Sequence, residues 1–90
     1  MNTPRIQNVI PLENKRLRVT FRDNTIKVYD FNPLLATERF RLLREEAFFR
    51  AVRVDSGGYG ISWNDDLDLS EDEVRQNGVT VATPQVAETR

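Results

Sequence analysis

The sequence of 90 residues is long enough for one domain with one small core, because compact domains usually contain about 100 to 150 residues. It contains no Cys and no His, which excludes disulfides, thiol nucleophiles and metal sites built on thiolate or imidazole ligands. An apolar fraction of 39% can fill a core, and 30% charged residues indicate a well-solvated surface. Most enzyme mechanisms use Cys or His side chains, which this chain lacks, so we first expect a binding protein.

Charge is distributed unevenly along the chain. Residues 1–54 contain eleven Lys and Arg against six Asp and Glu, a net charge of +5, whereas residues 55–90 contain two against eight, a net charge of −6. Two explanations fit this asymmetry: the halves neutralise each other in the fold, or one face meets a charged partner. They differ in where the charges lie in space.

The compartment is indicated by what the sequence lacks. The N-terminal residues have no apolar stretch of the signal-peptide kind, and no window approaches the ~18 apolar residues of a membrane-spanning helix. We therefore expect a cytoplasmic protein without a membrane partner.

The first part of the chain is typical of an antiparallel meander. A strand is expected at residues 6–10, followed by a half-buried strand at 17–21, where apolar and polar side chains alternate with a period of two. Asp23-Asn24 is a hairpin signal, since both residue types tolerate positive φ, and a third strand returns beyond it. This pairing predicts one apolar face of Leu17, Val19, Phe21, Ile26 and Val28, and one basic, solvated face of Arg16, Arg18, Arg22 and Lys27.

The middle of the chain combines helix and hairpin signals. Residues 37–50 contain no Gly or Pro, which predicts one helix or two short ones. Gly57-Gly58 permits a reversal between strands at 52–54 and 59–63. The apolar stripe of the expected helix consists of Phe40, Leu43, Ala47 and Phe48.

A second helix is indicated near the C-terminus. Ser70-Glu71-Asp72-Glu73 is a capping box, in which the Ser70 hydroxyl and the Glu73 carboxylate each accept the other residue's backbone N–H, and Gly78 is expected to end the helix in the left-handed conformation. The expected fold is α+β, an antiparallel β-meander sheet packed against two or three short helices. Residues 1–78 are assigned to the domain, and 79–90 to a C-terminal strand or mobile tail.

Three stretches together resemble a small bacterial family catalogued as domain of unknown function 2442. They are L-x-V-x-F-x-D-N-x-I-x-V-x-D-F-x-P-L-L at 17–35, F-F-R-A-V-R-V at 48–54 and W-N-D-D-L-D-L-S-E-D-E-V at 63–74. The resemblance implies an α+β fold with a meander sheet on short helices, and a role in regulation or toxin neutralisation. Asn24 stands where the family's hairpin often has Gly, and Val74-Arg75 replaces a more usual Leu-Tyr.

Acidic residues between 65 and 73 are the densest candidate chemistry. As a calcium loop this run fails, because its sixth position is Glu71 instead of Gly and its twelfth is Asn77 instead of Glu. No metal and no cofactor are therefore expected. The acids can instead cap turns and solvate the approach to the helix, or they can ring an apolar binding patch.

Two functions from different classes follow from these features. The first is a non-catalytic binding module, regulatory or antitoxin-like, that recognises a protein partner, such as a basic toxin-like protein. The second is a nucleic-acid-binding module that uses the basic hairpin face of Arg16, Arg18, Arg22 and Lys27. An enzyme ranks third, because a chain without His or Cys would need a carboxylate pair or a Lys in a pocket. The partner-binding residues of the first hypothesis are Tyr59, Trp63, Asp65, Asp66 and Asp68. For Trp63 the alternative, which the sequence favours, is a core aromatic whose indole N–H bonds to a neighbouring loop.

Overall fold

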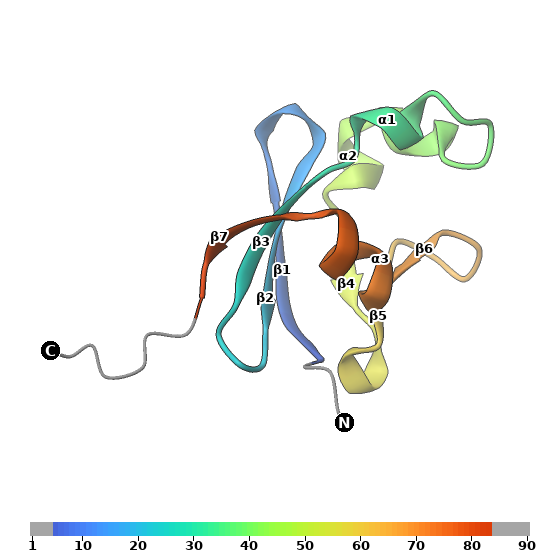
Figure 1. Ribbon diagram of the computed structural model, residues 1–90. Helices are drawn as coiled ribbons and strands as arrows, with labels where there is room; N and C mark the ends of the chain where they lie inside the picture. The colour runs from blue at the N-terminus through green and yellow to red at the C-terminus, as the bar shows by residue number, and fades with distance from the viewer. Residues whose placement is uncertain (1–4, 84–90) are drawn as a thin grey trace, which may run out of the picture.

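Two antiparallel sheets and several short helices make up the computed structural model, which describes residues 5–83 (Figure 1). This confirms the α+β prediction. The first sheet has the strand order β1-β2-β3-β7 and the second the order β4-β5-β6. The strands are β1 (Ile6–Leu12), β2 (Arg16–Phe21), β3 (Ile26–Asp30), β4 (Arg53–Val54), β5 (Gly60–Ser62), β6 (Asp68–Ser70) and β7 (Val79–Ala82).

The helices are all short and lie, with the second sheet, on one side of the first sheet (Figure 1). The α-helices are α1 (Asn32–Leu35), α2 (Glu46–Phe49) and α3 (Glu71–Asn77), and the 3-10 turns are η1 (Glu13–Lys15), η2 (Arg41–Arg44) and η3 (Ser56–Gly58). No helix within residues 5–83 is long and apolar enough to span a membrane.

The β2–β3 hairpin pairs its strands in a different register from the one expected. Its loop contains three residues, 22–24, closed by bonds between Phe21 and Thr25 and between Asn24 and Phe21, with Asn24 at φ 74°. Because the loop has an odd number of residues, Leu17 lies opposite Tyr29 and Val19 lies opposite Lys27. The prediction that Ile26 and Val28 share the buried face is therefore wrong: both lie on the opposite face of β3.

The observed register also separates the four residues of the expected basic face. Arg16 and Arg18 lie on the outer face of β2, while Lys27 lies on the inner face, where its Nζ donates to the backbone oxygen of Arg75 at 2.7 Å. Arg22 lies in the exposed loop. The four cations therefore do not form one surface.

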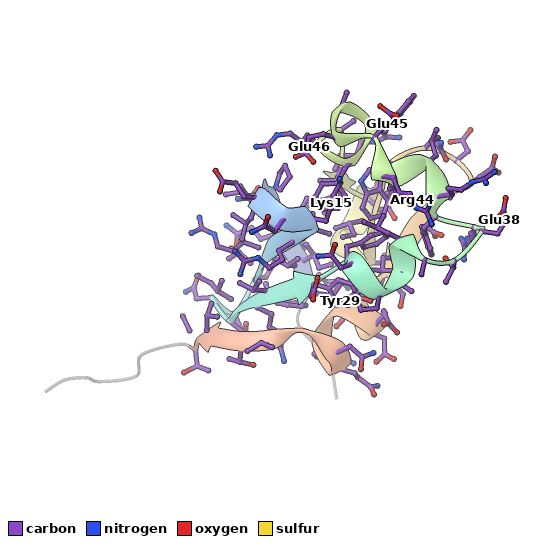
Figure 2. All side chains as sticks on the ribbon, turned by 90° about the horizontal axis from the view of Figure 1, so that it is seen from above. Lys15, Tyr29, Glu38, Arg44, Glu45 and Glu46 are labelled. Atoms are coloured by element: carbon purple, nitrogen blue, oxygen red, sulfur yellow. The ribbon has the colours of Figure 1, made fainter. Side chains whose placement is uncertain are left out.

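Of the two alternatives for residues 37–50, one helix or two short ones, the structure has two short ones, η2 and α2. Glu45 has an extended backbone (φ −74°, ψ 121°) that separates η2 from α2 and shifts the helical phase between them. Phe40 and Leu43 are buried as predicted, but Phe49 is buried in place of Phe48, which is 50% exposed. One cation fixes this segment to the first sheet: Lys15 donates to the backbone oxygen of Arg44 at 3.0 Å and pairs with Glu46 at 3.2 Å (Figure 2).

An aromatic cluster occupies the centre of the core. Phe31 is fully buried, and its ring centroid lies 5.1 Å from those of Phe40 and Trp63 and 5.9 Å from that of Phe49. Phe31 directly follows β3 and precedes α1, so the turn between them positions it. That turn is held by Asp30, whose carboxylate accepts the backbone N–H of Asn32 at 3.0 Å.

Helix α3 begins and ends where the sequence predicts, with different terminal contacts. The Ser70 hydroxyl accepts the backbone N–H of Glu73 at 3.0 Å, but the Glu73 carboxylate contacts Tyr29 and Asn77 instead of completing the capping box. Gly78 is extended (φ −78°, ψ 155°) and not left-handed. Glycine is required there for space, because a Cβ would lie 2.7 Å from the Val74 oxygen.

Replacing Ser70 with alanine is expected to lower the free energy of unfolding by about 0.5 to 2 kcal/mol, because the Glu73 N–H loses its acceptor. Chemical denaturation measures the loss, and amide exchange at Glu73 locates it. Ser70→Thr keeps an acceptor oxygen and serves as the control. Unchanged exchange at Glu73 in the alanine variant would show that this cap does not hold the helix.

Strand β7 extends the domain beyond its expected end at residue 78. Val79 pairs with Val28, and Thr80 with Lys27, so residues 79–82 belong to the first sheet. Of the two alternatives for this segment, the strand is therefore found for 79–82. The expected mobile tail at 84–90 lies outside the described residues.

Candidate functional site

The aromatic anchor of the expected binding patch lies inside the protein. Trp63 is only 7% exposed, its indole N–H donates to the backbone oxygen of Phe49 at 2.9 Å, and its ring packs on Phe31 and Phe49. These contacts satisfy both its polar atom and its apolar area. Trp63 is therefore a core residue in this structure and offers little surface to a partner.

The remaining members of the expected patch lie at different places along the β5–β6 hairpin. Gly60 pairs with Ser70 and Ser62 with Asp68, so Tyr59 precedes one end of the hairpin while Asp65 and Asp66 lie in the loop at the other. Tyr59 is 61% exposed and stacks with the Arg5 guanidinium, 4.0 Å from its ring centroid. The structure therefore does not bring the five residues together.

Ion pairs show how the two oppositely charged halves are arranged. Among the described residues, one pair joins them: Arg39 with Asp68, at 3.1 Å. The others form within the first half, as Lys15 with Glu46, or within the second, as Arg75 with Glu71 and Asp72. Most acidic residues within 55–83 therefore form no ion pair with the basic first half of the chain.

Two adjoining depressions form a groove between α1 and α3, which we call the α1–α3 groove. Their volumes are about 400 and 340 Å³, and both are lined by Leu34 of α1 and Glu73 of α3. The first is also lined by Arg39, Phe40, Asp68, Leu69 and Ser70, and the second by Val28, Tyr29, Asp30, Pro33, Asn77 and Val79.

Glu73 lies where the two depressions meet. Its Oε2 accepts hydrogen bonds from the Tyr29 hydroxyl and from the Asn77 amide, both at 2.9 Å, which fix the carboxylate against β3. Burial, together with the neighbouring Glu73 carboxylate, raises the pKa of Tyr29, so its hydroxyl remains a donor at neutral pH. Figure 2 shows Tyr29 beside α1, on the strand that forms the floor of the groove.

The α1–α3 groove is acidic along its length. Asp30, Glu73 and Asp68 contribute three carboxylates against the single guanidinium of Arg39, a net charge of −2. Hydrogen bonds from the Asn32 side chain and backbone lower the pKa of Asp30, which favours its charged form. Between the charges the walls are apolar: Leu34, Pro33, Phe40, Leu69 and Val79. An extended cationic segment with apolar side chains fits this chemistry.

Metal binding has no cluster to support it in the described part of the chain. Residues 5–83 contain no group of three or more His, Cys, Asp or Glu placed to hold an ion. The carboxylates of the acidic run are spread over the β5–β6 loop, β6 and α3, because the strand and the helix direct them to different surfaces.

Of the residues singled out from the sequence, Asp68 is the one that lines the groove. Other residues that line it, above all Glu73, Tyr29 and Leu34, were not predicted to bind a partner. One signal was available: most residues that line the groove lie in two of the stretches that carry the family resemblance, 17–35 and 63–74.

Comparison with known proteins finds one family model that matches most of the chain. The family model described as protein of unknown function, DUF2442, matches residues 6–79, which covers both sheets as far as the first residue of β7. The chain therefore belongs to the DUF2442 family, as its motifs indicate. No match is found among curated proteins or among solved structures.

Proposed function

We propose that this protein is a non-catalytic binding module of the cytoplasm, whose α1–α3 groove receives a basic segment of another protein. The observation that carries the proposal is the groove itself, in which three carboxylates alternate with apolar walls. Apolar area supplies most of the affinity of such a contact, while charge selects the partner and speeds association. A small basic toxin-like protein has the required chemistry, which would give the module a regulatory or antitoxin-like role.

Binding to nucleic acid through the hairpin is supported less well by the same geometry. Single-stranded nucleic acid is bound by basic faces that also present aromatic rings for stacking. Tyr29, the aromatic residue of β3, points inward to Glu73, and the outer face carries Ile26 and Val28 beside Arg18. Lys27 also lies on the inner face. We therefore keep this function as an alternative outcome of the test below.

Neutralising the groove is expected to weaken capture of a basic partner about ten-fold or more, because a charge-complementary contact loses two carboxylates. The test compares the full-length protein with the double variant Asp68→Asn, Glu73→Gln as bait in a lysate of its native host. Proteins and nucleic acids in the same eluate are identified, and the purified partner is titrated at several salt concentrations.

The matched control is the double variant Asp65→Asn, Asp66→Asn, which removes the same charge from the β5–β6 loop outside the groove. It is expected to retain most of the affinity and salt dependence of the wild type. Equal losses in both variants would show that general acidity, and not the groove, attracts the partner. Retention of nucleic acid, lost on Arg16→Gln with Arg18→Gln, would establish the hairpin function instead.

A further inference from the structure

The last strand of the first sheet presents an open edge. Strand β7 pairs with β3 on one side, and among residues 5–83 no strand pairs with its other side. All four of its residues are exposed, with Val79 at 67% and Val81 at 56%. Both views place β7 at the outer border of the sheet (Figures 1 and 2). Its outward backbone N–H and C=O groups are available for another strand.

The opposite edge of the same sheet, strand β1, is protected against pairing with another strand. Strand β1 contains Pro11, has a register shift between Ile6 and Asn8, and has β4 and η3 packed beside it. Proline, bulges and covering elements are the devices by which proteins prevent edge-to-edge pairing. Strand β7 shares one of them, a register shift at Val81, and has no proline and no charge.

Charge argues for a second copy of this chain as the occupant. Residues 76–87 are the longest uncharged run in a sequence that is 30% charged, so two β7 strands can pair without bringing like charges together. The whole chain has a net charge of −1, which produces little repulsion between copies. In an antiparallel pair whose two-fold axis passes beside Val81, Val81 lies opposite its own copy and Thr80 lies opposite the partner's Ala82, so no charged residue enters the contact.

We propose that two copies pair antiparallel through β7, which joins their first sheets into one continuous sheet of eight strands. Val79 of β7 also lines the α1–α3 groove, but Val81, the residue changed in the test below, does not, so the test separates this contact from the proposed function. Pairing of two four-residue strands buries much less than the ~1,200 Å² typical of a stable interface, so we expect a weak dimer that forms only at high protein concentration.

Sedimentation equilibrium of the full chain between 10 µM and 1 mM tests this proposal. Wild type is expected to associate as a dimer, and Val81→Lys to weaken the dimer about ten-fold, because two cations then meet across the two-fold axis. Val81→Glu should do the same, whereas an equimolar mixture of the two variants should associate more strongly than either alone. Leu42→Lys, on the exposed surface of η2, is the matched control and should associate like wild type.

A wild-type protein that remains monomeric at 1 mM would overturn the proposal, as would a Val81→Lys variant that dimerises like wild type or a mixture that shows no gain. Amide exchange of the wild type supplies a measurement without substitution. Protection should increase with concentration at residues 79–82, and an increase confined to other residues would assign the dimer to another surface.

Discussion

Replacing Phe31 with alanine is expected to lower the free energy of unfolding by about 3 to 5 kcal/mol. Phe31 is fully buried and contacts Phe40, Phe49 and Trp63, so the truncation leaves a cavity that its aromatic neighbours cannot all close. A domain of this size is stabilised by about 5 to 13 kcal/mol, so the variant loses a large part of that margin.

Denaturation by urea measures this loss, with the fluorescence of Trp63 as the signal, since it is the single Trp of the chain and packs on Phe31. Phe48→Ala is the matched control, because it removes the same ring from a half-exposed position that is next to Phe49 in the sequence but outside the buried cluster. A loss below about 1 kcal/mol for Phe31→Ala would mean that the aromatic cluster is not the centre of the core.

Replacing Gly58 with alanine is expected to cost about 2 to 4 kcal/mol, through two effects that act together. Gly58 has a φ of 78°, which L side chains adopt at a cost, and its added Cβ would lie 2.5 Å from the backbone oxygen of Ile6. That oxygen belongs to β1 and cannot move without disturbing the sheet. The expected result is a lower midpoint of thermal and urea unfolding.

Gly57→Ala separates the two effects. Gly57 has a similar φ of 85°, but its Cβ would meet the side chain of Tyr59, which is exposed and can move away. The expected cost is therefore about 1 to 2 kcal/mol, from the backbone alone. If the two variants are equally destabilised, close packing of η3 on β1 contributes nothing measurable.

Features set by neighbouring residues could be predicted from the sequence. The buried face of β2 follows from the alternation of Leu17, Val19 and Phe21, and the start of α3 from the hydroxyl of Ser70. The bond from Asn32 to Asp30 is equally local. Each depends on groups a few residues apart, where the backbone leaves few alternatives.

Features that depend on the number of residues in a loop, or on contacts between distant parts of the chain, could not be predicted from the sequence. One additional loop residue, Arg22, exchanges the two faces of β3, and an extended Glu45 changes which of Phe48 and Phe49 is buried. The α1–α3 groove requires α1 and α3 to meet, although about 40 residues of chain separate them. Burial of Trp63 with a bonded indole N–H could be expected from the sequence, but its acceptor, the backbone oxygen of Phe49, could not.

The return of β7 to the first sheet has a consequence for how the chain folds. Strands β1, β2 and β3 are contiguous in sequence, so their pairing closes short loops, whereas Lys27 and Thr80 are 53 positions apart. Closing that loop costs more chain entropy and needs the second sheet and α3 in place. During synthesis, β3 is therefore expected to leave the ribosome with an open edge that stays uncovered until the chain has been made beyond Ala82.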